Sequence, residues 1–242
     1  MVITIPHFAG ERQGIRHFFG TRQQGTAPVF AAPGVVSVNQ VHGTDVLVVD
    51  RPVSGMPTFD GGWDALVTDP AGVLLTVKTA DCVPVLIHDP LTRVVAAVHA
   101  GWRGAVAGII PKTITVMHKR FGSQPDSLRM SIGPAAGACC YEVDEPVLAR
   151  LRESHAGWQD LIKKTGQGRT KLNLRGLVRG QAREAGVPEA GIHSVSLCTI
   201  CHATLFHSYR REGTARGTMV SGIMLAPRRP ASRRAGRKRR AN

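Results

Sequence analysis

The sequence lacks both a long apolar run and an export signal. No run of roughly eighteen apolar residues, the length that a membrane-spanning helix requires, occurs among its 242 residues. The N-terminal segment also has no basic region followed by a continuous apolar stretch, which is the pattern of a secretory signal. We therefore expect a soluble protein that is located in the cytoplasm.

Cysteine is scarce, and its number is odd. The chain has five cysteines, and in the absence of an export signal we expect them in a reducing compartment. A disulfide framework is therefore not expected. The thiols should be reduced and available for a metal ion or for catalysis.

Acidic residues are missing from the segment 228–240, which is rich in Arg and Lys. The formal net charge of the chain is +14, and subtracting the eight basic residues of this segment leaves +6. Such a basic segment with little apolar content is typical of a disordered, solvated tail. We therefore predict one catalytic domain over 1–227 and a basic tail over 228–242. Weak contact of the tail with RNA or another polyanion is the alternative reading.

Short apolar segments rich in β-branched residues alternate with segments of helical periodicity. No internal repeat or long linker divides them, which favours a single domain. Several predicted strands are apolar throughout, as expected for strands covered on both faces. The pattern predicts an α+β fold of mixed β-sheets layered with helices. The expected strands are 35–41, 46–49, 66–68, 73–77, 83–87, 94–98, 194–198 and 219–225, and the expected helices are 103–120, 144–153 and 174–184.

Three predicted strand ends carry residues of the types that bind transition metals. They are His42 in NQVHGTD, Cys82 in TADCVP and His99 in AVHAGWRG. Loops at the ends of buried strands commonly place functional groups. Two imidazoles and one thiolate form a catalytic zinc set that leaves the fourth coordination position open, and copper is the alternative ion. A lone histidine or cysteine is more often structural, and the spacing alone is no zinc signature.

The segment around Arg103 offers a second chemical feature. Gly101 and Gly104 flank Trp102 and Arg103 where a predicted strand passes into a predicted helix. Backbone N–H groups and a guanidinium could converge there on an anion such as phosphate. An equally weighted alternative to the anion site is a simple tight turn with Arg103 in solvent.

These segments together resemble the YfiH-like family, also called laccase-domain or multicopper polyphenol oxidase-like proteins and described as purine nucleoside phosphorylases. The resemblance covers the chain to about Pro227. It is carried by HFFGTRQQG, NQVHG, DALVTD, TADCVPVLI, VHAGWRG, IGPAAGACCYEV and LCTICHATLFHSYRREG. It implies that His42, Cys82 and His99 are the metal ligands, and that the fold is similar to the catalytic domain of cytotoxic necrotizing factors.

The resemblance also implies an activity. Family members are reported to cleave adenosine, guanosine, inosine and methylthioadenosine with phosphate, giving the base and ribose 1-phosphate, and to deaminate adenosine. We accordingly expect His42, Cys82 and His99 to be catalytic, with Asp81 as a candidate proton carrier. Arg22 and Arg103 are expected to hold phosphate, and Asn39 to bind substrate. The expected cofactor is Zn²⁺, with Cu²⁺ as the alternative.

Two other enzyme readings and one non-enzyme reading remain open. The older family label indicates a copper-dependent polyphenol oxidase (laccase), which would need further clustered copper ligands. A hydrolase that edits cell-wall precursors, with Cys82 as nucleophile and His99 as base, is the second. A module that binds RNA through its basic tail is the third.

The remaining cysteines are expected to be structural. Cys139 and Cys140 are adjacent, so in an extended segment they would point in opposite directions and would not share a metal ion. The segment from Cys198 to His202 matches both the attachment pattern of covalent haem and half of a zinc knuckle. Haem attachment needs an export context, so we expect Cys198 and Cys201 to be a buried structural pair, with a local redox pair as the alternative.

Overall fold

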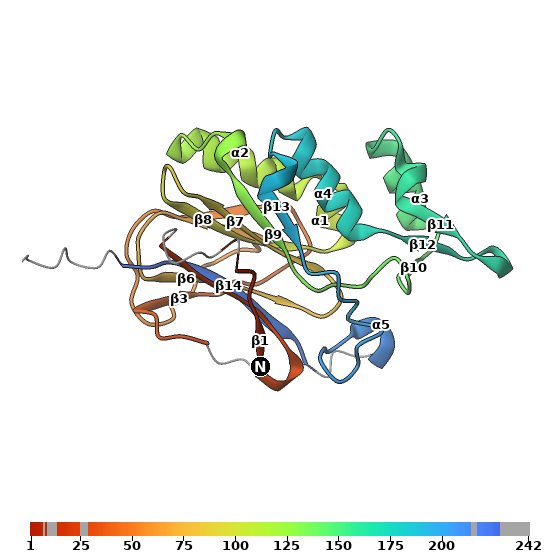
Figure 1. Ribbon diagram of the computed structural model, residues 1–242, viewed down its shortest axis with the longest axis horizontal. Helices are drawn as coiled ribbons and strands as arrows, with labels where there is room; N and C mark the ends of the chain where they lie inside the picture. The colour runs from red at the N-terminus through yellow and green to blue at the C-terminus, as the bar shows by residue number, and fades with distance from the viewer. Residues whose placement is uncertain (7, 9–13, 25–28, 214–216, 228–242) are drawn as a thin grey trace, which may run out of the picture.

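The computed structural model describes residues 1–6, 8, 14–24, 29–213 and 217–227. The segment that we predict as a basic tail, 228–242, lies outside the described residues. Two large sheets and a layer of helices are stacked on one another (Figure 1). Both parallel and antiparallel strand pairs occur in each large sheet, so the predicted α+β fold of mixed sheets layered with helices is confirmed.

The six-stranded sheet is the middle layer. Its strand order is β13-β9-β7-β8-β5-β4. The bounds are β13 (Ile192–Ser194), β9 (Arg129–Ile132), β7 (Val83–Asp89), β8 (Val94–Ala100), β5 (Ala65–Thr68) and β4 (Val46–Val49). Every residue of β7 and β8 is buried, because helices cover one face of the sheet and the second sheet covers the other. The apolar runs had predicted this double coverage.

The five-stranded sheet is an outer layer. Its order is β1-β2-β14-β6-β3. The bounds are β1 (Val2–Ile3), β2 (Ile15–Gly20), β14 (Met219–Leu225), β6 (Val73–Thr79) and β3 (Gly34–Val36). Phe19, Leu75 and Ile223 of this sheet pack against Leu66 and Leu86 of the six-stranded sheet in one apolar cluster. This cluster holds the two sheets face to face.

Helices form the third layer, on the opposite face of the six-stranded sheet (Figure 1). They are α1 (Trp102–Val106), α2 (Ile109–Phe121) and α4 (Leu174–Glu184). The single helix expected over 103–120 is wrong, because the chain breaks between α1 and α2 at Gly108, whose φ is 86°. Pro111 explains the restart, since proline is tolerated in the first turn of a helix but not in its interior. None of the helices in the described part of the chain has the length and apolar character needed to cross a bilayer.

A small third sheet and two short helices complete the described fold. The small sheet has the order β10-β12-β11, with β10 (Glu142–Val143), β12 (Thr170–Leu172) and β11 (Ile162–Lys164). Together with α3 (Glu145–Ser154) it lies at one end of the molecule (Figure 1). The other short helix, α5 (Tyr209–Glu212), follows a long segment without regular structure. Short 3-10 turns occur at Arg22–Gln24, Pro125–Ser127, Trp158–Leu161, Gly166–Gly168 and Glu189–Gly191.

The strand expected over 194–198 is wrong in its position. Strand β13 ends at Ser194, where its parallel ladder with β9 also ends, opposite Ile132. Gly133 and Pro134 follow Ile132 directly, and a proline has no N–H with which to extend a ladder. Only an isolated bridge between Ala135 and Cys198 remains beyond this point. The chain from 195 to 201 is thereby released to form loops beside the site described below.

Replacement of Leu86 by alanine should destabilise the fold strongly. Leu86 is fully buried between the two large sheets, and truncation of a core leucine typically costs about 2–5 kcal/mol of unfolding free energy. Chemical denaturation should show this loss. Leu91→Ala is the matched control, because Leu91 is 79% exposed. Equal stability of the two variants would contradict the two-sheet core.

Candidate metal centre

The three predicted metal ligands come together where the central strands β7 and β8 of the six-stranded sheet begin and end. His99 lies near the end of β8, Cys82 directly precedes β7, and His42 lies in the loop before β4. Strand pairing sets Val83 opposite Ala100, which brings Cys82 beside the end of β8. The donor atoms of His42, Cys82 and His99 all lie within 4.8 Å of one another. Segments remote in the sequence thus form one compact donor set.

Asp64 organises this donor set, and sequence reasoning missed it. Its carboxylate accepts hydrogen bonds from the backbone N–H groups of Val41 (3.2 Å), His42 (3.0 Å) and Gly43 (2.6 Å). It also contacts His99 Nδ1 at 2.7 Å. Burial acts to raise the pKa of Asp64, but the hydrogen bonds from His99, Gly43 and His42 outweigh it and hold the pKa below its usual value. The only available signal was a carboxylate directly before a buried strand, in DALVTD.

The contact with Asp64 determines which nitrogen of His99 can bind a metal ion. An ionised carboxylate accepts hydrogen bonds and cannot donate one. Nδ1 of His99 therefore carries the proton, and Nε2 of His99 faces the other two donor atoms. Burial acts to lower the pKa of His99, but Asp64 and Cys82 raise it to about 9. Burial acts to raise the pKa of Cys82, but hydrogen bonds from His42 and His99 lower it to about 7. The electrostatics therefore favour a thiolate, which is the metal-binding form of cysteine.

Two backbone features keep the centre of the donor set open. His42 has φ of 61°, a left-handed conformation that is unusual for a residue with a side chain, and the hydrogen bonds to Asp64 hold it there. At Gly101 a Cβ atom would lie 2.7 Å from His42 Cδ2 and 3.2 Å from Cys82 Sγ. Any side chain at this position would therefore displace the ligands. The residues present fit a bound transition-metal ion with three protein ligands.

A cavity of about 510 Å³ adjoins the donor set. That volume lies within the range of small-molecule sites. Aromatic and cationic side chains share its wall with the three ligands. The lining residues are Gln40, His42, Lys78, Thr79, Ala80, Asp81, Cys82, His99, Trp102, Arg103, Tyr141, Leu174, Tyr209, Arg210 and Thr218.

Comparison with known proteins decides the family. Residues 20–226 match the family described as multi-copper polyphenol oxidoreductase laccase. This chain belongs to that family. The chain also resembles two solved members in structure. The YlmD structure of Geobacillus stearothermophilus has a TM-score of 0.78 at 30% identity, covering 92% of this chain and 94% of that one. The YfiH structure of Bacillus licheniformis has a TM-score of 0.76 at 28% identity, covering 87% of this chain and 92% of that one. The resemblance to the YfiH-like family and its fold is confirmed.

Curated relatives in the family carry names of nucleoside enzymes. The protein named purine nucleoside phosphorylase YlmD, from Geobacillus stearothermophilus, is 37% identical over 198 residues, which are 78% of this chain and 71% of the relative. The protein named adenosine deaminase RL5, from an unknown prokaryotic organism, is 33% identical over 195 residues, which are 78% of this chain and 74% of the relative.

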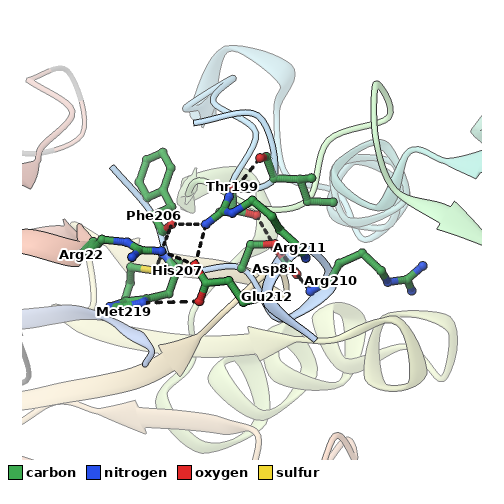
Figure 2. Close-up of polar contacts among 11 residues, drawn as sticks. Arg22, Asp81, Thr199, Phe206, His207, Arg210, Arg211, Glu212 and Met219 are labelled. Carbon is green, nitrogen blue, oxygen red and sulfur yellow. Dashed lines mark hydrogen bonds and ion pairs between the residues drawn. The ribbon is translucent and has the colours of Figure 1, made fainter. Parts of the chain in front are cut away.

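Asp81 lines the cavity, but its carboxylate is already engaged. It accepts hydrogen bonds from Thr199 Oγ1 (2.6 Å), Ser208 Oγ (3.0 Å) and the backbone N–H of Arg210 (2.7 Å) (Figure 2). Its own φ is 87°, so the chain bends sharply just before Cys82. The arrangement fixes the C-terminal segment against the metal centre. The role of Asp81 as a proton carrier stays a prediction.

The three residues expected to bind substrate do not all reach the cavity. Arg103 lines it, with its guanidinium carbon 4.5 Å from the Trp102 ring centre. Arg22 is not among the lining residues; it pairs with Glu212 and donates to the Phe206 carbonyl at 3.3 Å (Figure 2). Asn39 lines a separate surface cavity.

Gln40 and Arg210 also occupy the cavity wall. Gln40, next to Asn39, pairs through its carboxamide with the backbone of Lys78, at 2.8 Å to N and 2.9 Å to O. The Arg210 guanidinium lies 5.0 Å from the centre of the Tyr141 ring. Arg210 belongs to the HSYRREG motif, and the fold places it in the cavity wall.

The adjacent cysteines do not point in opposite directions, as was expected for an extended segment. Residues 138–140 form a turn and not an extended segment, so the alternation of side chains does not apply. Cys139 Sγ and Cys140 Sγ lie 3.5 Å and 3.2 Å from Cys201 Sγ. Cys198 is buried as expected, whereas Cys201 is exposed.

Asp64→Asn should weaken zinc binding by roughly 10–100-fold, the usual effect of losing a partner of a metal-binding histidine. An amide cannot accept from all four donors that Asp64 accepts from, so both His99 and the His42 loop lose their orientation. Competition with a chromogenic chelator would measure the affinity. Asp45→Asn is the matched control, since Asp45 is exposed and its carboxylate pairs with Lys112. Unchanged affinity in Asp64→Asn would refute the organising role.

Zinc binding to the metal-free protein should release more protons at pH 6 than at pH 8. At pH 8 the thiol of Cys82, with a pKa of about 7, is mostly ionised, whereas His99, with a pKa of about 9, keeps a proton that must leave Nε2. At pH 6 the Cys82 thiol is mostly protonated as well, so more protons must leave when zinc binds than at pH 8. Titration calorimetry in buffers of different ionisation enthalpy counts them. A smaller release at pH 6 would contradict the assigned protonation states.

Proposed function

We propose that this protein is a zinc-dependent purine nucleoside phosphorylase that also deaminates adenosine. The observation that carries the proposal is the cavity in which the set His42, Cys82 and His99 meets aromatic and cationic side chains. The names of curated relatives support the two activities. The expected nucleosides are adenosine, guanosine, inosine and methylthioadenosine.

His42, Cys82 and His99 would hold the metal ion. Zinc is proposed because two histidines and one cysteine form a known catalytic zinc set with an open fourth position, and copper is the alternative. A bound zinc ion supplies Lewis acidity and lowers the pKa of water. The protein supplies the orientation of His99 through Asp64 and the open space in front of Gly101.

Three aromatic side chains in the cavity wall would hold the purine. Trp102, Tyr141 and Tyr209 line the cavity, and stacking of a base on an aromatic ring contributes about 1–3 kcal/mol. Burial, with a smaller contribution from Cys82, raises the pKa of Tyr141 to about 12. Its hydroxyl therefore stays protonated at neutral pH and can donate a hydrogen bond to the base or to the ribose.

Cationic side chains in the same wall would hold phosphate. Lys78, Arg103 and Arg210 line the cavity, and guanidinium groups bind phosphate through paired hydrogen bonds. Arg22 would have to exchange its partner Glu212 to take part. We therefore assign phosphate first to Arg103 and Arg210. For Asp81 we propose that it positions the backbone of Arg210, because its oxygens already accept three hydrogen bonds.

Incubation of the purified protein with inosine, with and without phosphate, tests the proposal. Chromatography should detect hypoxanthine and ribose 1-phosphate only when phosphate is present. Adenosine should additionally give inosine whether or not phosphate is present. Cys82→Ala should reduce both activities by roughly 100-fold or more, because removal of a ligand weakens both metal binding and orientation. Equal turnover by the wild type and Cys82→Ala would refute the proposal.

The phosphate site has its own variant and control. Arg103→Ala should raise the KM for phosphate and leave deamination of adenosine nearly unchanged, since deamination uses no phosphate. Arg120→Ala is the control, because Arg120 is an exposed arginine that pairs with Asp50 and lies outside the cavity. An unchanged KM for phosphate in Arg103→Ala would remove Arg103 from the site.

One observation favours a second candidate, a hydrolase with Cys82 as nucleophile. Hydrogen bonds from His42 and His99 lower the pKa of Cys82 to about 7 against the effect of its burial, and a thiolate beside a histidine is also the arrangement of cysteine nucleophiles. Metal content separates the two candidates. Activity that survives complete removal of metal supports the nucleophile, whereas activity that is lost on chelation and restored by zinc supports the phosphorylase.

The family description suggests oxidation of phenols by copper. Within the described residues, the clusters able to bind a metal are the His42–Cys82–His99 set and a group of four cysteines. A multicopper oxidase requires further imidazole-rich sites for its other copper ions. We therefore place this reading below nucleoside chemistry, and assay of a phenolic substrate with the copper-loaded protein would show whether it applies.

A further inference from the structure

Four cysteines outside the candidate metal centre form a second cluster of donor atoms. They are Cys139, Cys140, Cys198 and Cys201, and their sulfur atoms all lie within 4.8 Å of one another. They come from two loops, one between β9 and β10 and the other between β13 and α5. The two loops are far apart in the sequence: Cys140 and Cys201, whose sulfur atoms are in contact, are separated by 61 positions. Tertiary folding alone brings these thiols together.

The spacing of the sulfurs matches coordination of one ion. In a tetrahedron with Zn–S bonds of about 2.3 Å, neighbouring sulfurs lie about 3.8 Å apart. The sulfurs of Cys139 and Cys140 lie 3.5 Å and 3.2 Å from that of Cys201, and the upper limit for the group is 4.8 Å. A disulfide requires sulfurs about 2.05 Å apart, and an iron–sulfur cluster would hold its thiolates farther apart because the cluster fills the centre.

The backbone around Cys198 is arranged for a thiolate. Cys198 and Cys201 have the Cys-x-x-Cys spacing of a zinc-binding turn. The backbone N–H of Gly137 donates to Cys198 Sγ at 3.2 Å, and those of Ile200 and Cys201 point to the same atom. Such N–H donors stabilise sulfur in its ionised, ligating form.

Gly137 provides an independent sign that the space between the thiols is kept clear. A Cβ atom at Gly137 would lie 3.0 Å from Cys198 Cβ, 3.1 Å from Cys139 Sγ and 3.3 Å from Cys198 Sγ. The position therefore tolerates a side chain only if the cysteines move. A Cβ atom at Gly101 would likewise contact the His42–Cys82–His99 set. Each donor cluster therefore lies against a glycine that leaves space for its side chains.

We propose that Cys139, Cys140, Cys198 and Cys201 bind one Zn²⁺ ion as a closed, structural site of four thiolates. Four protein ligands complete a tetrahedron and leave no position for substrate. The site is therefore distinct in kind from the three-ligand centre. Basic groups nearby offset its negative charge: Lys171 Nζ donates to the Cys139 carbonyl at 2.5 Å, and Arg175 donates to the Leu197 carbonyl at 2.7 Å.

The ion would connect two walls of the cavity. Cys140 directly precedes Tyr141, which lines the cavity. Thr199, between Cys198 and Cys201, donates to Asp81, and the carbonyls of Thr199 and Ile200 accept from Arg211 at 2.7 Å and 2.9 Å (Figure 2). Tying the cysteine loops together therefore holds Tyr141 and the Asp81 network in fixed relation. The proposal does not depend on which reaction the cavity performs.

Elemental analysis of the full-length chain, purified with a thiol reductant, tests the second site. The wild type should contain about two zinc ions per chain, and Cys201→Ser and the matched Cys82→Ser should each contain about one. After cobalt substitution, Cys82→Ser should keep the intense sulfur-to-cobalt charge-transfer bands of a four-thiolate site. Cys201→Ser should lose most of that intensity while keeping the spectrum of the one-thiolate centre.

Other results would overturn the proposal. One zinc per chain in the wild type, lost in Cys82→Ser and retained in Cys201→Ser, would show that the four thiols bind no zinc. A wild-type mass lower by two hydrogens, with two thiols fewer on titration under denaturing conditions, would show a disulfide instead. If Cys201→Ser does not fold, the sulfur coordination number from zinc X-ray absorption of Cys82→Ser decides: four sulfurs support the site, and fewer overturn it.

Discussion

The carboxylate of Asp64 is the interaction on which the rest of the site depends. It is buried and receives three backbone N–H groups of the His42 loop as well as the imidazole of His99. One side chain therefore orients two of the proposed ligands at once, from a position directly before β5. A charge that is buried but fully hydrogen-bonded is costly to disturb, so the loop and the ring keep their places before any metal ion binds.

The layered fold makes this precision possible. Strands β7 and β8 are buried over their whole length, and their antiparallel register brings Cys82 to the same edge as His99. The other wall of the cavity is added by the C-terminal segment, which Asp81 holds through Thr199, Ser208 and Arg210. The side chains proposed to bind substrate come from several elements: Trp102 and Arg103 lie in α1, Tyr209 and Arg210 lie in α5, and Lys78 lies in β6.

The two clusters of donor atoms illustrate how the number and type of ligands determine the role of a metal ion. Cys82 shares its site with two imidazoles, which leaves an open position for chemistry. The proposed four-cysteine site is closed, and its effect on the cavity would act through Tyr141 and Thr199. The family description refers to copper, but ligand chemistry of this kind is shared by copper and zinc. If the four-cysteine site also binds zinc, the total metal content alone does not report on the three-ligand centre.

The sequence by itself determined the local features: the apolar runs of β7 and β8, the amphipathic helix Leu174–Glu184, and His42, Cys82 and His99 at strand ends. Only the tertiary structure revealed Asp64 as their organiser, the four-cysteine cluster, and the turn of Arg22 away from the cavity toward Glu212. Pro111 was a signal that a new helix begins near Gly108, but the helical spacing of apolar residues continues across the break and led to the prediction of one helix. The physical reason is the distance along the chain over which each effect acts. Periodicity and side-chain chemistry act over a few residues, whereas the distance between remote side chains is set by how strands pair and layers pack.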